Sequence, residues 1–128
     1  MSAPQPGARA TYRVESAENG TVVHVFNEID IANANMLGEA LLRIVEARRP
    51  VAIDLSQLVY IDSVGLHILL RAFQHAERLG TDAALVAGGQ IRQLVEQVGL
   101  DRIVRVFPDA ASAFKAMKIK SRSPAEPL

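Results

Sequence analysis

The sequence predicts an α/β domain in which helices pack on a mixed, mostly parallel sheet of about five strands. Short apolar runs typical of strands alternate with longer segments whose apolar residues recur at helical spacing. The connections between these segments are short, which favours neighbouring elements lying side by side. The first two strands follow each other without a helix between them, so they supply the antiparallel part of the sheet. The expected order is β-β-α-β-α-β-α-β-α.

Length and composition limit the possible functions. The 128 residues suggest one domain, and the 49% apolar content is enough for a packed core. The formal net charge of zero argues against a nucleic-acid binder, which needs a basic face. The absence of cysteine excludes disulfides, thiol chemistry and cysteine-type zinc sites. No apolar run approaches the ~20 residues of a membrane helix, and no signal peptide is recognisable. We therefore expect a cytoplasmic domain with no membrane partner.

The two ends of the chain differ in composition from the middle. Residues 1–10 are rich in Pro, Gly and Ala and predict a disordered lead. Residues 119–128 contain Lys, Ser, Arg and Pro with little to bury, which indicates a flexible tail. The folded domain is therefore expected to span residues 11–118.

The first strands are expected at residues 11–15 and 21–26. Between them lies Glu18-Asn19-Gly20, and Asn-Gly is the strongest two-residue signal for a hairpin turn. The second strand is the more continuously apolar of the two, so it should lie further inside the sheet.

The rest of the chain alternates between segments with apolar residues at helical spacing and short apolar runs typical of strands. Leu37, Ala40, Leu41 and Ile44 form one face of a helix. The segments expected after the hairpin are a helix at 33–47, a strand at 51–55, a helix at 63–79, a strand at 83–87, a helix at 91–98, a strand at 103–107 and a helix from 108 to 118.

A polar pair, Asp62 and Ser63, stands where an apolar run gives way to the second of these helices. Ser63 is thus at or next to a helix N-terminus, where unpaired N–H groups and about half a positive charge favour an anion. A hydroxyl at this place is suited to carry a phosphate. Position alone, however, predicts no more than a helix cap.

The surrounding string carries more information. Val51-Ala-Ile-Asp-Leu-Ser56, followed by Ile61-Asp-Ser-Val-Gly-Leu66, resembles the central motif of the STAS domain, the fold of bacterial anti-sigma factor antagonists. The resemblance covers roughly residues 11–118 and implies a single STAS-type domain. In that family the serine after the aspartate is phosphorylated by the partner kinase, which maps onto Ser63. The same motif supplies four candidates for partner binding: Asp62, Val64, Gly65 and Leu66.

A second segment shares the resemblance. STAS domains carry Gly-Glu-Leu/Ile-Asp before the first helix, and this chain has Asn27-Glu28-Ile29-Asp30. Asn27 replaces the glycine, and asparagine tolerates positive φ well. The resemblance implies that Glu28 and Asp30 belong to the partner surface. The alternative is a plain strand exit with Asp30 capping the next helix.

The function implied by the resemblance is regulatory binding without enzymatic activity. The unphosphorylated chain would bind an anti-sigma factor that is also a serine kinase, and so free a sigma factor. Phosphorylation of Ser63 would end the binding. The partner would hold the ATP, and the chain itself would need no cofactor and be a monomer or weak dimer. The alternative within the family is a STAS subunit of a stress-signalling complex or of lipid-transport machinery.

Two rival chemistries were considered from the residues. Ser63 and His67 are four apart, and Asp62 or Asp54 could complete a hydrolase triad, but the sharp Gly-x-Ser-x-Gly elbow is missing. Asp54 could instead be the phosphoacceptor of a receiver-like domain. That class needs an acidic pair after the first strand and a lysine after the last, and the sequence has neither arrangement. The histidines lack metal-ligand spacing, so no metal site is expected.

Overall fold

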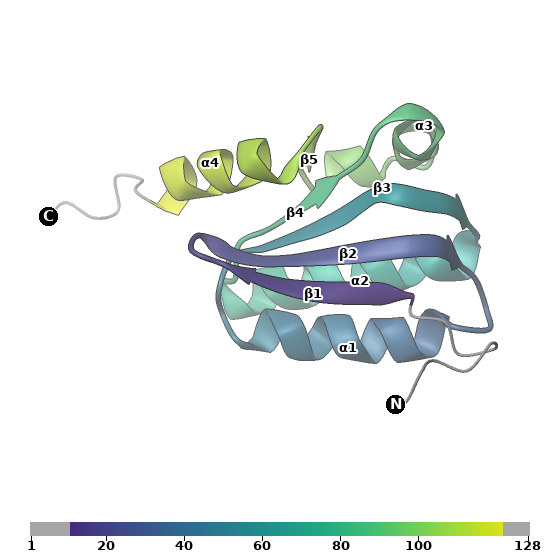
Figure 1. Cartoon of the computed structure of the whole chain (residues 1–128), viewed down its shortest axis with the longest axis horizontal. Helices are drawn as coiled ribbons and strands as arrows, with labels where there is room; N and C mark the ends of the chain where they lie inside the picture. The colour runs from purple at the N-terminus through teal and green to yellow at the C-terminus, as the bar shows by residue number, and fades with distance from the viewer. Residues whose placement is uncertain (1–10, 122–128) are drawn as a thin grey trace, which may run out of the picture.

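The computed structural model describes residues 11–121 and confirms the predicted fold class (Figure 1). Its elements are β1 (Tyr12–Ala17), β2 (Gly20–Ile29), α1 (Ala34–Glu46), β3 (Val51–Ile61), α2 (Ser63–Leu79), β4 (Ala83–Val86), α3 (Gly89–Gln97), the 3₁₀ helix η2 (Leu100–Arg102), β5 (Val106–Phe107) and α4 (Ala110–Ser121). The five strands lie in the order β1-β2-β3-β4-β5. Only the β1–β2 pair is antiparallel. As predicted, β2 is internal and β1 is at the edge.

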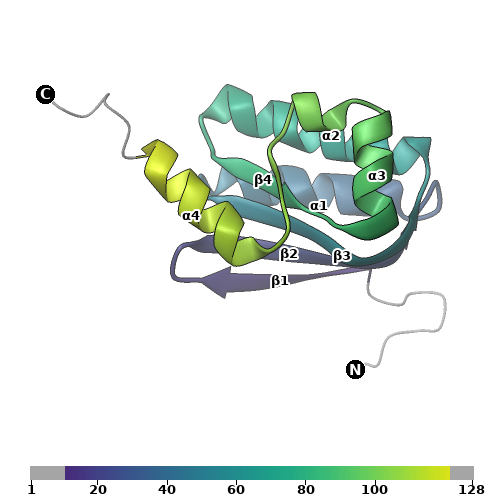
Figure 2. The same ribbon diagram turned by 90° about the horizontal axis from the view of Figure 1, so that it is seen from above.

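The helices cover both faces of the sheet, as Figures 1 and 2 show. Helices α1 and α2 lie side by side on one face, and α4 lies on the other. The larger core is packed between the sheet and the α1–α2 pair, around Val25, Leu41, Ile53 and Leu69. A smaller cluster joins α4 to the sheet through Ala52, Ala84, Phe114 and Met117. Helix α4 packs over only part of its face of the sheet. On the uncovered part of that face, β1 carries the polar side chains of Arg13 and Glu15.

The hairpin turn differs by one residue from the prediction. Ala17 pairs with Gly20, so the loop is Glu18–Asn19 and the glycine begins β2. Gly20 has φ +153°, and a Cβ built there would collide with the carbonyl oxygen of Pro50. Glycine is therefore required both by this backbone conformation and by the close approach of the Pro50 carbonyl oxygen at the entrance to β3.

Strands β2 and β3 are both longer than predicted. They extend to Ile29 and Ile61, whereas the sequence predicted ends at residues 26 and 55. Two register irregularities, between His24 and Phe26 and between Asn27 and Glu28, interrupt the alternation from which strand ends are read. Asn27 has φ +64°, so it does adopt the left-handed conformation expected of it, but inside a strand.

The C-terminal part also differs in detail. The predicted strand 103–107 is reduced to β5, because η2 occupies the preceding residues. Helix α4 begins after Asp109, whose Oδ1 accepts a hydrogen bond from the N–H of Ser112 at 2.7 Å. The backbone N–H and the hydroxyl of Ser112 hold the pKa of the Asp109 carboxyl below its usual value. The helix continues to Ser121, past the predicted boundary at Lys118.

The lead at 1–10 and the end of the tail at 122–128 lie outside the described residues. In the part of the chain that the structure describes, no helix combines the length and apolar character needed to span a membrane.

Candidate functional site

The candidate site lies where the parallel strands β2 and β3 end and α2 begins. The N–H of Asp62 donates to the carbonyl oxygen of Ile29 at 3.1 Å, so the two chain segments leaving the strands are tied together. This bond places the end of β2, with Glu28, and the loop that follows it, with Asp30, beside the start of α2. The two segments that carry the family motif are thereby brought to one end of the sheet.

Helix α2 is capped by Asp62 and not by Ser63. The Oδ1 of Asp62 accepts a hydrogen bond from the N–H of Gly65 at 2.9 Å, and its carbonyl oxygen accepts one from the N–H of Leu66 at 3.0 Å. Ser63 is the first residue of the helix and is exposed. The prediction that it lies at or next to a helix N-terminus is confirmed, but the capping role belongs to its neighbour. The Ser63 hydroxyl is therefore accessible for modification.

This division of roles leads to a stability prediction. Asp62→Ala removes the cap and should lower the free energy of unfolding by about 0.5–2 kcal/mol. Ser63→Ala removes no cap and should cost less than about 0.5 kcal/mol. Urea unfolding of both variants measures the difference, with Asp62→Asn as a control that keeps a capping oxygen. A larger loss for Ser63→Ala than for Asp62→Ala would contradict the assignment of the cap.

The loop after β2 is held by its own side chains. The Oδ1 of Asp30 accepts from the N–H of Ala32 at 3.0 Å, so Asp30 closes a turn and does not cap α1. Asn33 accepts from the N–H of Asp30 at 3.1 Å and donates to the carbonyl oxygen of Glu28 at 2.9 Å. Asn33 was not singled out from the sequence, where a polar residue before a helix predicts only a cap. Its two bonds give the loop a defined shape, and Glu28 stays exposed.

Gly65 was predicted to belong to the partner surface, but the structure leaves no room for a side chain at this position. Gly65 is buried, and a Cβ built there would lie 2.7 Å from Cγ1 of Ile61 and 2.8 Å from Cγ2 of Ile29. Both isoleucines belong to the core. Leu66 is half-buried and also packs on the core, whereas Val64 is exposed. Gly65 thus allows the first turn of α2 to approach the ends of β2 and β3 closely.

Several large apolar side chains around this site are exposed, and sequence reasoning missed four of them. Ile31 is 77% and Val59 is 76% exposed. Together with Val64, the exposed set near the start of α2 comprises Ile31, Met36, Val59 and Tyr60. Grouped exposed apolar residues mark interaction surfaces. The only feature of the sequence that could have indicated their exposure is that Ile31 and Val59 fall outside the apolar alternation of the predicted strands.

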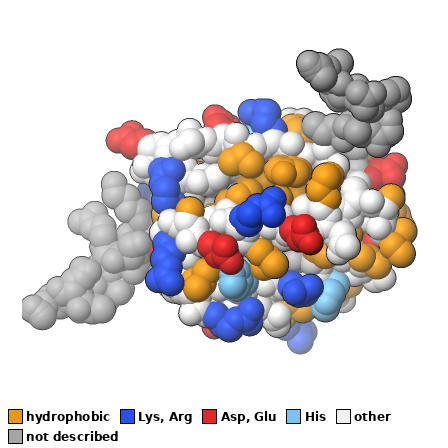
Figure 3. All heavy atoms as spheres, turned by 90° about the horizontal axis from the view of Figure 1, so that it is seen from below, with side chains coloured by type: hydrophobic (Ala, Val, Ile, Leu, Met, Phe, Trp, Pro, Cys, Tyr) orange, Lys and Arg blue, Asp and Glu red, His pale blue; other side chains and the backbone are white. Residues whose placement is uncertain are grey.

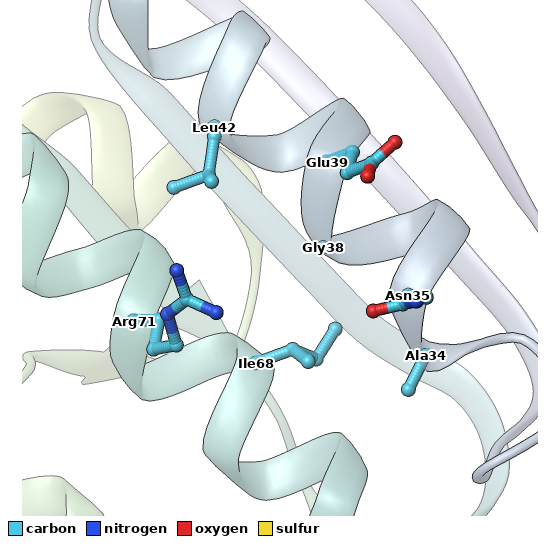
Figure 4. Close-up of a pocket in the computed structure, with 7 residues that line it drawn as sticks. All are labelled: Ala34, Asn35, Gly38, Glu39, Leu42, Ile68 and Arg71. Carbon is cyan, nitrogen blue, oxygen red and sulfur yellow. The ribbon is translucent and has the colours of Figure 1, made fainter.

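A hollow of about 230 Å³ between α1 and α2 adjoins this end of the molecule (Figure 4). Its sides are apolar at Ala34, Gly38, Leu42 and Ile68, and polar at Asn35, Glu39 and Arg71. On the face formed by α1 and α2, apolar side chains alternate with charges of both signs (Figure 3). The hollow is shallow and suits a partner's side chain better than a deeply enclosed ligand.

The geometry does not assemble a hydrolase site. In residues 11–121 no hydrogen bond joins Ser63 to His67, and the Asp62 carboxylate is engaged as a cap. The Oδ2 of Asp54 instead lies 2.9 Å from Nδ1 of His24, on a different part of the sheet. The same described residues contain no cluster of three or more His, Cys, Asp or Glu that could hold a metal ion.

The receiver alternative is also disfavoured. Asp54 was expected near a strand end with Ser56 in the following loop, but both lie inside β3. The Asp54 carboxylate accepts from the N–H of Ser56 at 2.9 Å and contacts His24, so it is committed to structure. The antiparallel hairpin at the sheet edge is likewise not the parallel arrangement that a receiver requires.

A mixed sheet with one antiparallel edge strand, helices on both faces and an exposed serine at the start of α2 is the arrangement that the STAS resemblance implied. The family model of the STAS domain matches residues 11–113, and the chain belongs to this family.

Three similar proteins illustrate the relationship. The anti-sigma-F factor antagonist RsfB of Mycobacterium tuberculosis is 32% identical over 123 residues, which cover 92% of this chain and 95% of RsfB. Osmosensory protein A of the same species is 32% identical over 101 residues, but the match spans only 62% of that protein and 76% of this chain. A crystal structure of an anti-sigma factor antagonist from Mycobacterium paratuberculosis superposes with a TM-score of 0.76 at 33% identity, covering 84% of this chain and 93% of the other.

Proposed function

We propose that the chain is an anti-sigma factor antagonist controlled by phosphorylation of Ser63. The observation that carries the proposal is the exposed Ser63 hydroxyl at the first position of α2, next to the exposed side chain of Val64. The similarity over nearly the whole length of RsfB supports the same role. The protein acts in the cytoplasm by binding, not by catalysis.

The unphosphorylated form docks an anti-sigma factor through the end of the molecule around Ser63. Burial of apolar surface drives this docking, at roughly 25 cal/mol per Å² removed from water. The exposed side chains of Ile31, Val59 and Val64 are suited to the centre of such an interface. The hydrogen-bonded loop around Asp30 and Asn33 presents Ile31 with little ordering cost on binding. The hollow between α1 and α2 accepts a side chain of the partner at the margin.

Phosphorylation ends the docking through charge and bulk. A phosphate on Ser63 adds about −1.5 to −2 charges, which the N-terminus of α2 accommodates. Asp62 is adjacent, Glu28 lies near the end of the neighbouring strand β2 and Asp30 follows it, so the same surface becomes strongly acidic. Burying that charge against apolar contacts is unfavourable. A coupling of about 3 kcal/mol would change the affinity by about two orders of magnitude.

The partner is therefore an anti-sigma factor that also has serine kinase activity and binds the ATP. In the unphosphorylated state the antagonist occupies this partner and a sigma factor is released. The rigid loop and capped helix allow the switch to operate without rearrangement of the fold.

Phosphate mapping tests the proposal. We expect the chain, incubated with its kinase partner and ATP, to carry phosphate at Ser63 when analysed by mass spectrometry. Ser56 is the exposed rival, whereas Thr81 is buried with its hydroxyl donating to the carbonyl oxygen of Val45 at 3.0 Å. Ser63→Ala is the control and should remain unmodified. Phosphate on Ser56 with Ser63 bare would contradict the site assignment.

Failure of any serine kinase partner to bind would instead favour the alternative role, as a STAS subunit of a stress-signalling or lipid-transport assembly. Co-purification of the wild-type chain and of Ser63→Asp from the native cells separates these roles. We expect a kinase partner to co-purify with the wild-type chain, and much less of that partner to co-purify with Ser63→Asp.

A further inference from the structure

The edge strand β1 offers backbone hydrogen-bonding groups to a further strand. It pairs only with β2 among the strands that the structure describes, and it forms one edge of the sheet (Figures 1 and 2). The N–H of Phe26 donates to the carbonyl oxygen of Thr11 at 2.8 Å. Hydrogen-bonded and non-hydrogen-bonded pairs alternate along an antiparallel ladder. Arg13 and Glu15 therefore direct their backbone groups toward β2, while Tyr12, Val14 and Ser16 direct theirs outward.

The side chains along this edge form a pattern that is complementary to itself. Arg13 and Glu15 flank Val14, which is 47% exposed. If a second copy of β1 pairs antiparallel with Val14 facing Val14, Arg13 of each copy faces Glu15 of the other. The outward backbone groups of Tyr12, Val14 and Ser16 then coincide with the hydrogen-bonded positions of this register. Charge and backbone requirements thus select the same alignment.

We propose that the protein forms a weak homodimer through antiparallel pairing of β1 with β1 of a second copy, centred on Val14. The two sheets join into one across a twofold axis, the symmetry that such a self-complementary strand imposes. This inference rests on β1 alone and does not depend on phosphorylation of Ser63.

Contacts within the chain hold both charges and the strand in place. Oε1 of Glu15 lies 2.8 Å from Nε2 of His24, whose Nδ1 lies 2.9 Å from Oδ2 of Asp54. The Arg13 guanidinium lies over the ring of Phe26, 6.0 Å from its centroid. Both side chains are therefore supported from the same face of the sheet, which lowers the entropy lost when they pair across the edge.

The hairpin end of β1 is supported as well. Arg49 donates to the hydroxyl of Ser16 at 3.1 Å and to the carbonyl oxygen of Ala17 at 2.6 Å. Arg49 lies between α1 and β3, and its two bonds tie this segment to the end of β1. The strand is thereby kept straight over the residues that the pairing requires.

Charged residues on an edge strand often prevent pairing. Charges of one sign would do so here as well, because they would face like charges in a second copy. Opposite signs at equal distances from an apolar centre attract instead, and such cross-strand pairs stabilise a sheet. A six-residue strand pair buries less than the ~1,000 Å² typical of stable complexes, so the dimer is expected to be weak.

Charge exchange tests the register. By symmetry each dimer contains two Arg13–Glu15 pairs, so Arg13→Glu or Glu15→Arg alone turns two attractions into two repulsions. Sedimentation equilibrium of the full chain at low salt should show a dimer dissociation constant at least about tenfold higher for each single variant. The double variant Arg13→Glu/Glu15→Arg restores opposite charges and should return to within about threefold of the wild type. Thermal unfolding of all three confirms that they are folded.

A proline substitution at Val14 tests the outer edge of β1 without disturbing its pairing with β2. Val14→Pro removes only an outward-facing N–H and should abolish the dimer while the chain stays folded, whereas Val14→Thr should retain it. A wild-type chain that remains monomeric at millimolar concentration would overturn the proposal. So would a dimer that survives Val14→Pro, or one that the double charge exchange fails to restore.

Discussion

Ser63→Asp should weaken binding to the anti-sigma partner by about ten- to a hundredfold. The aspartate places one negative charge where the phosphate would sit, beside Asp62 and next to the loop that carries Asp30. The helix N-terminus favours the anion, so the variant should be at least as stable as the wild type. An aspartate has less charge and bulk than a phosphate, and the loss should therefore be smaller than that caused by phosphorylation. Titration calorimetry against the partner with ADP present measures the affinity.

Two controls separate charge from shape. Ser63→Asn has nearly the size of the aspartate variant without its charge and should bind within about threefold of the wild type. Ser63→Ala should bind permanently in the presence of ATP, because it cannot be phosphorylated. Equal affinities for the Asp, Asn and Ala variants would show that charge at this position does not control docking.

Gly65→Leu should destabilise the fold severely. A Cβ at this position already lies within 3.0 Å of Ile29 and Ile61, and the Ile29 atoms involved are its Cβ and Cγ2, which cannot move without the strand. Gly65→Ala should cost about 1–3 kcal/mol from overpacking, reduced by the up to ~1 kcal/mol that alanine contributes in a helix. Leucine adds three more carbons to the same contact and should cost more. Chemical denaturation followed by circular dichroism measures both variants.

Gly88→Leu is the matched control, since a Cβ at Gly88 meets no atom within 4 Å and its φ is negative. It should change the free energy of unfolding by less than about 1 kcal/mol. A stable Gly65→Leu chain that has lost only partner binding would show that Gly65 belongs to the docking surface after all, contrary to its buried position.

The sequence alone predicted the class of fold and the position of Ser63 at the start of a helix. Apolar periodicity distinguishes strands from helices because it reflects burial on one face, and this signal located the five strands and the four α-helices in their correct order. The Asp62-Ser63 pair at a strand-to-helix junction predicted a serine at or next to a helix start, because junction chemistry is local, whereas only the structure showed that Asp62 is the cap and that Ser63 is exposed. The family resemblance then assigned that hydroxyl a role.

Tertiary structure decided what depends on contacts between distant residues. Strands β2 and β3 continue past the two bulges in β3, since pairing continues wherever a neighbouring strand is available, whatever the local alternation. Burial of Gly65 depends on Ile29, 36 positions earlier in the chain, and no local pattern could reveal that contact. The exposure of Ile31 and Val59, and the self-complementary edge at Val14, likewise emerge only once the strands are ordered, because apolar character in a sequence does not say which side chains the fold leaves uncovered.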